Sequence, residues 1–318
     1  MNPPIHKIAL IFRPQSPELS SACKALIACF QRHGIEVCAL ESSVRALGLD
    51  RALACTPQEL SSRAQALVSL GGDGTLISAV RQSIVGGIAS GSAANKLPVL
   101  GINMGRLGFL TAITPEQLDS FIPLLLSGEY ALDSHHLLQG KLEFGSVESS
   151  GADCDDLDSS TRESKKTNPP TSSAPFYVLN EILITKKDIA GMIKITASIN
   201  NEHFHTYRAD GLIIATPTGS SAYNISAGGS LVHPQCRVIL LTPVCAHSLT
   251  QRPMIVSDNF CLQFSVEEDS VIMLDGQERI DFRKGDTLIV QGSFPIQLIQ
   301  HPKRSYFAVL EEKFGLGG

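Results

Sequence analysis

One carboxylate surrounded by glycines offers the clearest chemistry in this sequence. Residues 71–75 read Gly-Gly-Asp-Gly-Thr, between the apolar run 66–70 and apolar residues at helical spacing. A turn from a strand into a helix gathers backbone N–H groups at the positive end of the helix dipole, and glycine lets that backbone approach a phosphate closely. Asp73 would repel such an anion. We therefore expect its carboxylate to act on a hydroxyl group or a metal ion, unless it only caps the helix.

A polar pair lies within an apolar stretch later in the chain. Asn180 and Glu181 separate the apolar run 176–179 from the run 182–184. Burying such a pair is costly unless both side chains form hydrogen bonds. The pair is therefore either a binding element or the edge or bulge of a strand.

A second polar segment, residues 208–229, has the composition of a binding turn. Arg208 and Asp210 precede a short apolar strand, and a turn rich in Thr, Ser and Gly follows it, with Tyr223 as its one aromatic residue. Small hydrogen-bonding side chains beside an aromatic ring suit a flat heterocycle with polar edges better than an apolar ligand. Hydroxyl-rich turns also cap helices, and here a helix would begin near Ser221.

Several well-known site motifs are absent from the sequence. It contains neither the Gly-x4-Gly-Lys-Ser/Thr phosphate loop nor a Gly-x-Gly-x-x-Gly turn after a strand, and it lacks His-Glu-x-x-His and Gly-x-Ser-x-Gly. His203 and His205 would share one face of a strand, but no third metal ligand is nearby. The acidic run 153–158 lacks the sixth-position glycine and the distal glutamate of a calcium loop. The sequence thus assigns no metal ligands.

Length and composition describe a globular protein with about two domains. Of the 318 residues, 43% are hydrophobic and 18% are charged, and the net charge is −5 with Lys and Arg scattered. We therefore expect no nucleic-acid partner. No apolar stretch approaches the roughly 20 residues of a membrane helix, and the N-terminus has no signal-peptide pattern. Eight cysteines without paired spacing indicate reduced thiols, so we expect a cytoplasmic protein with no membrane partner.

The loop around Asp73 belongs to a predicted N-terminal α/β domain, residues 1–128. Apolar strands alternate with helical patterns there, which favours a Rossmann-like parallel sheet with helices on both faces. The expected strands are 7–12, 36–40, 66–70 and 97–102, and the expected helices are 18–33, 75 to about 87, and 115–126. In such sheets ligands bind beyond the carboxyl ends of the strands, and Asp73 lies at one of these ends.

Residues 129–299 are predicted to form a second domain, a mainly antiparallel β-sandwich. The expected strands are 137–144, 177–185, 192–199, 204–208, 212–215, 237–241, 260–266, 271–274 and 287–291. The segment 145–175, rich in Ser, Asp, Thr and Pro, is predicted to be a disordered insertion. The tail from about 300 to 318 has a helical pattern over 305–314 and is expected to pack back on the first domain.

Together these motifs resemble the NAD kinase family. The loop 71–75 is similar to the signature loop that this family shares with diacylglycerol kinases, sphingosine kinases and, more loosely, phosphofructokinases. Asn180-Glu181, Asp210-Gly211 and the turn 216–223, in this order, are much more specific. Further similar segments are 107–110, 247–249, 252–253, 275–277 and 301–307. The resemblance is to the bacterial branch and covers nearly the whole chain except 145–175.

The chain departs from the family pattern at two positions. Ser221 stands where Thr is usual, which keeps the hydroxyl and loses a methyl group. Ser230 stands where Pro is common. Neither change removes a chemical function.

The resemblance implies transfer of the γ-phosphoryl group of ATP to the 2′-hydroxyl of the adenosine ribose of NAD, which gives NADP. Asp73 is then the general base that orients and deprotonates this hydroxyl. The backbone of Gly71, Gly72, Gly74 and Thr75 would bind phosphates.

The resemblance also implies which residues bind NAD. Asn180 and Glu181 would bind the adenosine portion, and Arg208 and Asp210 would serve the nicotinamide riboside end. Besides Asp73, the other implied NAD contacts are Gly74, Ser221, Ala222, Tyr223, Asn224, Ile225, Ser226 and Gln277. Tyr223 would pack beside the cofactor.

Partners follow from the same resemblance. We expect a homodimer or homotetramer, and a divalent cation, Mg²⁺, that arrives with ATP. Two other functions fit parts of the sequence: a lipid or sugar kinase with the same loop, or a non-catalytic NAD-binding sensor. The small, hydroxyl-rich turn 216–223 disfavours a lipid acceptor, and a sensor would gain nothing from a carboxylate facing phosphate.

Overall fold

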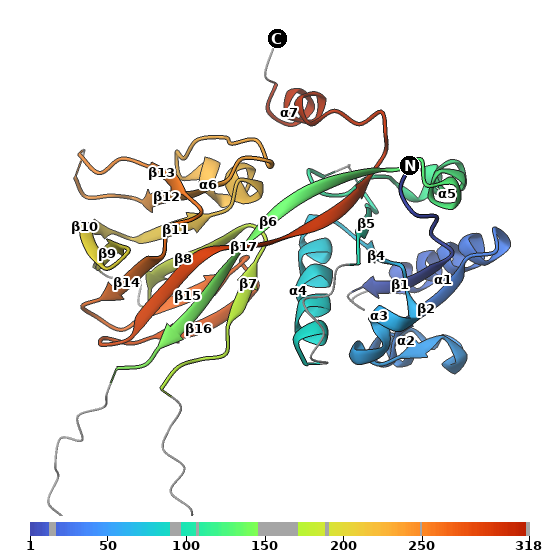
Figure 1. Cartoon of the computed structure of the whole chain (residues 1–318), viewed down its shortest axis with the longest axis horizontal. Helices are drawn as coiled ribbons and strands as arrows, with labels where there is room; N and C mark the ends of the chain where they lie inside the picture. Colours follow the sequence, from blue (N-terminus) through green and yellow to red (C-terminus); the bar gives the residue numbers. More distant parts are fainter. Residues whose placement is uncertain are drawn as a thin grey trace, which may run out of the picture. The chain divides into compact units, whose positions relative to one another are not determined.

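A computed structural model describes residues 1–12, 17–89, 97–105, 108–145, 171–187, 191–248 and 250–315 (Figure 1). Most of the predicted insertion 145–175, including the acidic run 153–158, lies outside these described residues. The chain forms two compact units. Unit 1 comprises residues 1–136 and 294–318, and unit 2 comprises residues 137–293, whereas the sequence placed the domain boundaries at 128/129 and near 299/300.

Unit 1 contains a parallel sheet in the order β17-β5-β4-β1-β2-β3. Its strands are β1 (Lys7–Phe12), β2 (Glu36–Leu40), β3 (Ala54–Cys55), β4 (Ala66–Leu70), β5 (Val99–Ile102) and the C-terminal part of β17 (Thr287–Gln300). Four of these strands match the predicted ones closely, because long apolar runs between turn residues are typical of buried parallel strands. The two-residue β3 was not predicted, because so short a strand leaves no pattern.

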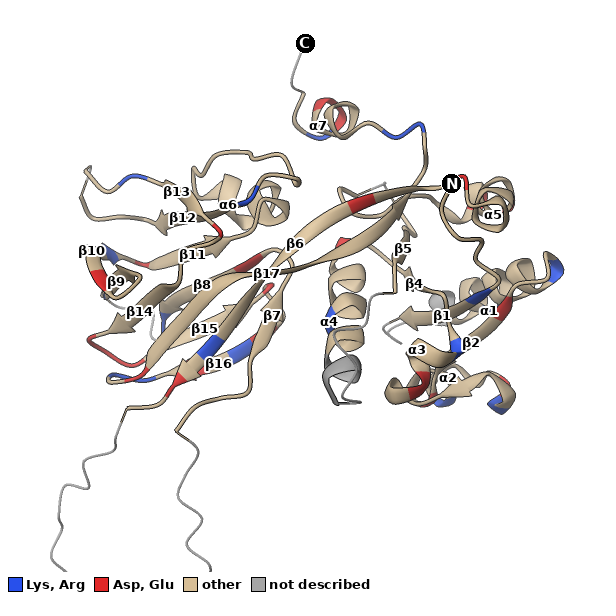
Figure 2. Cartoon of the chain, viewed as in Figure 1, with Lys and Arg blue, Asp and Glu red and all other residues tan. Residues whose placement is uncertain are grey.

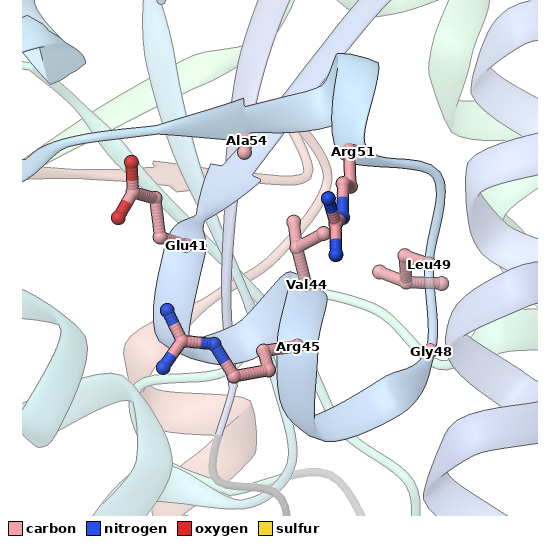
Figure 3. A pocket seen from close by; sticks show the side chains of 7 residues that line it. All are labelled: Glu41, Val44, Arg45, Gly48, Leu49, Arg51 and Ala54. Carbon is pink, nitrogen blue, oxygen red and sulfur yellow. The ribbon is translucent and has the colours of Figure 1, made fainter.

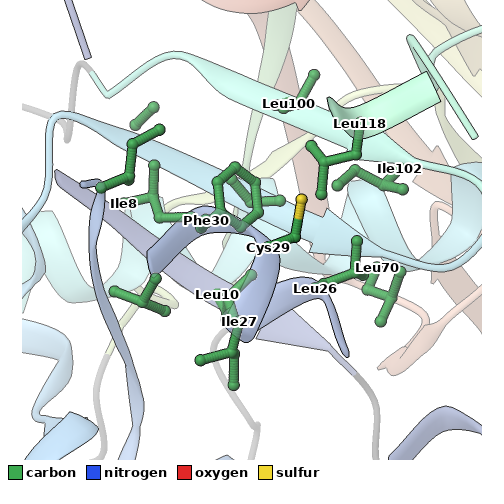
Figure 4. Close-up of a cluster of buried hydrophobic side chains, with 14 of the residues drawn as sticks. Ile8, Leu10, Leu26, Ile27, Cys29, Phe30, Leu70, Leu100, Ile102 and Leu118 are labelled. Atoms are coloured by element: carbon green, nitrogen blue, oxygen red, sulfur yellow. The ribbon is translucent and has the colours of Figure 1, made fainter. Parts of the chain in front are cut away.

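Helices cover both faces of this sheet. On one face α1 (Pro17–Arg32), α2 (Glu41–Leu47) and α5 (Leu118–Ser127) bury a cluster that includes Leu10, Phe30 and Leu118 (Figure 4). The other face carries α4 (Asp73–Ala89) and the short α3 (Leu60–Arg63). A Cβ atom on Gly101 of β5 would lie 2.6 Å from Leu76 of α4, so glycine allows this helix to pack tightly on the sheet.

The C-terminal segment also belongs to unit 1. Strand β17 ends at Gln300, and α7 (Tyr306–Phe314) follows after a short connection. Ser305 caps α7 by accepting the Ala308 N–H, and Gly315 ends the helix in a left-handed conformation with φ of 64°. This helix matches the predicted one.

Unit 2 consists of two packed sheets, as expected for a β-sandwich. One sheet has the order β10-β9-β14-β17, with β6 beside β17 and β7 beside β6, and the other has the order β13-β12-β11-β8-β15-β16. Their strands are the C-terminal part of β6 (Ala131–Glu143), β7 (Phe176–Val178), β8 (Glu181–Lys186), β9 (Ile193–Ile199), β10 (Glu202–Ala209), β11 (Gly211–Ala215), β12 (Val238–Val244), β13 (Met254–Ser257), β14 (Leu262–Val266), β15 (Ser270–Leu274), β16 (Glu278–Phe282) and the start of β17. Side chains from both sheets form one buried core.

The structure corrects several details of the predicted β domain. The expected strand 177–185 is two strands in different sheets, β7 and β8, and Asn180 lies in the break between them. The short helix expected near Ser221 is a 3₁₀ turn, Thr218–Ser221, followed by α6 (Tyr223–Ser226). His203 and His205 were expected to share one face of a regular strand, but the pairing of β10 with β9 shifts register between them.

Three general features concern membrane helices, cysteines and basic residues. No helix among the described residues is long and apolar enough to cross a membrane. The seven cysteines that the structure describes are free thiols. Lys and Arg are spread over many elements instead of gathering on one (Figure 2).

Candidate active site

The glycine loop forms the tight turn that its sequence predicts. Gly71 has a φ of 142°, and a Cβ atom there would lie 2.4 Å from the hydroxyl oxygen of Thr75. Its N–H donates to the carbonyl of Ile102 at 2.9 Å, which ties the turn to β5. The Gly72 carbonyl accepts the N–H of Thr75 at 2.9 Å, and α4 begins at Asp73. Gly72 and Gly74 are exposed at the N-terminus of this helix, where an anion is favoured.

The carboxylate of Asp73 is held by a second loop of unit 1, residues 108–111. Its Oδ2 accepts the N–H of Phe109 at 2.8 Å, and its Oδ1 accepts the N–H groups of Leu110 and Thr111, both at 3.2 Å. A Cβ atom on Gly108 would lie 2.1 Å from Oδ1. Asp73 is thus fixed by three backbone donors, and the close approach requires glycine at position 108.

The other side of loop 108–111 contacts two residues of the C-terminal segment. The guanidinium group of Arg304 donates to the carbonyls of Gly108 and Thr111, and the side-chain amide of Gln300 donates to the carbonyl of Leu110 at 3.1 Å. Sequence reasoning gave neither residue a role. The only signal was that Arg304 lies within the segment 301–307 that resembles the kinase family.

In unit 2 the polar pair Asn180 and Glu181 is held by Asp275. Oδ1 of Asp275 accepts the N–H of Asn180 at 2.7 Å and that of Glu181 at 3.1 Å, and Oδ2 accepts the N–H of Leu179 at 3.2 Å. The Asp275 N–H donates back to the carbonyl of Glu181 at 2.9 Å. The segments 180–181 and 275–277, which the sequence related only by family resemblance, therefore meet in space.

Both side chains of this pair retain an acceptor without a partner. The amide oxygen of Asn180 and Oε2 of Glu181 are buried and accept no hydrogen bond from the residues that the structure describes. Glu181 is only 7% exposed, and burial, with the nearby charge of Asp275, raises its pKa from 4.5 to about 7. Two neighbouring buried acceptors that lack donors make this pair a candidate for binding a ligand rich in N–H and O–H groups.

The hydroxyl-rich turn packs directly against this pair. Thr216 donates its N–H to the Asn180 carbonyl at 2.8 Å and its hydroxyl to the Leu179 carbonyl at 2.6 Å. A Cβ atom on Gly219 would lie 2.1 Å from the Asn180 carbonyl oxygen. The structure thus brings the start of this turn, residues 216–219, beside Asn180.

Within this turn, Asn224 has a structural role. Its amide nitrogen donates to the carbonyls of Ser220 and Ser230, and its amide oxygen accepts the hydroxyl of Thr242 at 2.6 Å. The side chain is completely buried, so it shapes the turn from beneath. Tyr223, in contrast, is 44% exposed, and Ser226 is exposed as well, so these two side chains are accessible to a ligand.

Three other predicted residues lie further along unit 2. Asp210 is paired with Lys186 at 2.9 Å. Arg208 is an exposed residue of β10, in the other sheet from β8. Gln277 follows Asp275 in the turn between β15 and β16, and its N–H donates to the carbonyl of Leu274 at 2.9 Å.

Two other features of unit 1 are separate from the glycine loop. An open pocket of about 680 Å³ is lined by residues of α2 and the segment after it, and none of the predicted site residues lines it (Figure 3). Cys29, His33 and Asp119 form the one group of three potential metal ligands among the described residues. Cys29 and His33 both form hydrogen bonds with Oδ1 of Asp119, and the Arg32 guanidinium lies 3.6 Å from the same oxygen. We therefore interpret this group as a cluster of hydrogen bonds and an ion pair.

Comparison with known proteins gives a consistent result over the full length. The model of the ATP-NAD kinase N-terminal domain matches residues 8–130, and that of the ATP-NAD kinase C-terminal domain matches residues 179–300. The NAD kinase of Helicobacter hepaticus is 43% identical over 321 residues, covering 99% of this chain and 98% of the relative. The NAD kinase of Wolinella succinogenes is 40% identical over 316 residues, covering 98% and 96%.

Two solved structures share the fold. Yeast NADH kinase in complex with NADH superposes with a TM-score of 0.80 at 21% identity, covering 99% of this chain and 89% of the yeast chain. An NAD kinase from Archaeoglobus fulgidus in complex with ATP gives a TM-score of 0.67 at 21% identity, covering 97% of each chain. None of these similarities favours a lipid kinase, a sugar kinase or a non-catalytic sensor.

Proposed function

This chain belongs to the NAD kinase family, and from this premise we propose how its residues carry out the reaction. As an NAD kinase it transfers the γ-phosphoryl group of ATP to the 2′-hydroxyl of the adenosine ribose of NAD and produces NADP and ADP. Phosphoryl transfer requires the nucleophile to be held in line and the phosphate charge to be neutralised. The protein therefore acts mainly by positioning its two substrates.

Asp73 is the proposed general base, and the bonds to its carboxylate support this role. A carboxylate offers about four acceptor positions. Backbone N–H groups of residues 109–111 occupy two on Oδ1 and one on Oδ2. The remaining position on Oδ2 accepts the ribose hydroxyl, fixes its direction and takes its proton as the oxygen bonds to phosphorus and ADP leaves. This carboxylate, fixed by three backbone donors at the N-terminus of α4, is the observation that carries the proposal.

Asn180 and Glu181 are proposed to bind the adenosine part of NAD. Within the described part of the chain their buried acceptors lack donors, and a nucleoside supplies such donors in its amino group and its ribose hydroxyls. The accessible face of the turn 221–226, with the ring of Tyr223, would complete this pocket. Arg208, Asp210 and Gln277 remain proposed contacts of the rest of NAD, and Asp210 would act as part of its pair with Lys186.

A divalent cation, Mg²⁺, is proposed to enter with ATP. Mg²⁺ prefers oxygen ligands and usually keeps phosphates and water among them. Among the described residues, no group of three potential metal ligands lies near Asp73. The group of Cys29, His33 and Asp119 offers sulfur and nitrogen besides oxygen, which Mg²⁺ does not prefer. The cation would therefore be held chiefly by the phosphates of the nucleotide, where it neutralises their charge.

We further propose that the protein works in the cytoplasm as a homodimer or homotetramer, without nucleic-acid or membrane partners. The scattered basic residues disfavour a nucleic-acid partner and the free thiols favour the cytoplasm, whereas the assembly is proposed from the family resemblance. Sedimentation analysis of the purified protein at micromolar concentration tests the assembly, and a purely monomeric species would contradict it.

One assay tests the activity. Purified protein is incubated with NAD, ATP and Mg²⁺, and NADP is measured with an NADP-specific dehydrogenase. We expect NADP to accumulate only when all three are present, and reactions lacking ATP or NAD are the controls. Failure to form NADP with any nucleoside triphosphate or polyphosphate donor would contradict the proposed function.

A further inference from the structure

Arg304 binds the side of loop 108–111 that faces away from Asp73. Its Nη2 donates to the carbonyl of Gly108 at 2.7 Å and to that of Phe109 at 3.2 Å, and its Nη1 donates to the carbonyl of Thr111. One planar guanidinium group thus holds three carbonyls of a four-residue loop. A lysine, with a single nitrogen, could not match this fork geometry.

The loop links Arg304 to the carboxylate of Asp73, because the same peptide groups form hydrogen bonds at both their carbonyl and their N–H ends. The peptide group between residues 108 and 109 accepts from Arg304 through its carbonyl and donates to Asp73 through its N–H. The next peptide group, between 109 and 110, does the same. The third, between 110 and 111, is bound by Gln300 at its carbonyl and by Asp73 at its N–H.

The charges at the two ends suit the dipoles of these peptide groups. Each N–H points to the negative carboxylate, and two of the three carbonyls accept from a positive guanidinium. Hydrogen bonds in such a chain polarise and strengthen one another. Burial lowers the pKa of Arg304, while Asp73, Asp133 and Glu312 raise it, and arginine stays charged in proteins.

We propose that Arg304, assisted by Gln300, is a positioning residue for the phosphoryl transfer. It fixes loop 108–111 and thereby fixes the one acceptor position that Asp73 keeps for the ribose hydroxyl. This inference rests on the proposed role of Asp73 as the general base. It predicts that Arg304 affects turnover more than substrate binding, although its hydrogen bonds to the loop are to backbone carbonyls.

A double-mutant cycle tests the coupling between Arg304 and Asp73. The turnover number kcat and the KM values for NAD and ATP are measured for wild type, Arg304→Met, Asp73→Asn and the double variant. We expect Arg304→Met to lower kcat on the order of 100-fold, as misplacing a reacting group by about 1 Å does, with both KM values changed less than about threefold. In the Asp73→Asn background the same substitution should lower kcat no further.

Matched variants separate positioning from folding. Lys303→Ala, at an exposed neighbouring residue, should leave kcat unchanged. Gln300→Met removes one loop contact. Since the buried amide oxygen of Gln300 has no hydrogen-bond partner among the described residues, we expect this variant to fold and to lower kcat by a smaller factor. Guanidinium ion at millimolar concentration should partly restore kcat of Arg304→Ala, which loss of a folded tail would not allow.

The outcomes distinguish this inference from the proposed function. An equal fold-loss of kcat from Arg304→Met in both backgrounds, with Asp73→Asn itself strongly impaired but still measurable, would overturn the positioning role and leave Asp73 as the base. Wild-type kcat in both Arg304→Met and Gln300→Met would also overturn it. Full turnover of Asp73→Asn would instead remove the base role, and with it the inference.

Discussion

Asp275 fixes the backbone of Asn180: its Oδ1 accepts the Asn180 N–H at 2.7 Å, the shortest of three bonds that this carboxylate accepts from residues 179–181. Asp275 itself has a φ of 49°, a left-handed conformation that Asp and Asn adopt more readily than most residues. In unit 2 the Asp275 carboxylate thus holds the backbone at the break between β7 and β8, and in unit 1 backbone N–H groups hold the Asp73 carboxylate. In each unit a carboxylate bonded to consecutive N–H groups fixes the local geometry.

Replacing Asp275 with asparagine should weaken both folding and NAD binding. Asparagine can keep the left-handed backbone conformation. Its NH₂ group, however, would replace one carboxylate oxygen and would face backbone N–H donors that this oxygen now accepts. Losing charged acceptors for buried donors costs about 1–3 kcal/mol each, so we expect unfolding free energy to fall by about 3 kcal/mol. The KM for NAD should rise because Asn180 and Glu181 are no longer held, and urea denaturation and steady-state kinetics measure the two effects.

A matched variant shows whether these effects are specific. Asp281→Asn changes an exposed carboxylate of β16 whose only described ion pair, with Arg279, spans 3.8 Å. Exposed pairs of this kind contribute little, so stability should change by less than about 0.5 kcal/mol. Equal behaviour of the Asp275 and Asp281 variants would contradict the anchoring role of Asp275.

Glu181 should make the protein less stable as the pH rises. Its pKa is raised from 4.5 to about 7 in the folded state, so the folded chain binds a proton more tightly than the unfolded chain. Its contribution to stability is therefore present below pH 4.5, is lost as the pH rises to about 7, and stays lost above it. The side chain of Glu181→Gln cannot ionise, so above pH 7 the free energy of unfolding of this variant should exceed that of wild type by on the order of 3 kcal/mol.

Urea denaturation at pH 5 and pH 8.5 measures this difference. The gain in unfolding free energy from Glu181→Gln should be large at pH 8.5. It should be small at pH 5, where the Glu181 carboxyl of the folded wild type is mostly protonated. Glu267→Gln, at an exposed glutamate, controls for the loss of one surface charge. An advantage of the same size at both pH values would show that burial does not perturb Glu181.

The sequence predicted best those elements whose residues carry a strong local pattern. Strand β4 and the turn at Gly71 follow from an apolar run that ends in glycines, and the structure has both. Strands β13 and β16 were missed because they are short edge strands of four and five residues whose side chains, such as those of Ile255 and Arg279, are largely exposed. Local pattern reveals buried strands better than exposed edges.

The site was predicted as residues and not as a hydrogen-bond network. Asp73, Asn180 and Glu181 could be selected because carboxylates and amides are unusual beside apolar strands. Arg304 could not, since it donates to backbone carbonyls, which every residue type provides. Contacts of a side chain with distant backbone leave no pattern in the sequence, and only the fold reveals them.

Asp73→Asn should remove turnover and preserve NAD binding. The amide cannot accept the proton of the ribose hydroxyl, and loss of a general base typically lowers kcat by about 10²- to 10⁴-fold. Binding depends instead on unit 2 residues such as Asn180, so the dissociation constant for NAD, measured by calorimetry, should change little. If Asp73→Asn instead bound NAD weakly and kept the wild-type kcat, this result would contradict the general-base role and assign Asp73 to binding.

Gly108→Ala tests the contact between loop 108–111 and Asp73 without changing either polar partner. The added methyl group would lie 2.1 Å from Oδ1 of Asp73, so the carboxylate and the loop must separate. Gly105→Ala is the matched control, because a Cβ atom there has no neighbour within 4 Å. We expect kcat of Gly108→Ala to fall on the order of 100-fold and that of Gly105→Ala to stay near wild type. Equal kcat values for the two variants, with unchanged thermal unfolding midpoints, would show that turnover does not depend on the fixed position of Asp73.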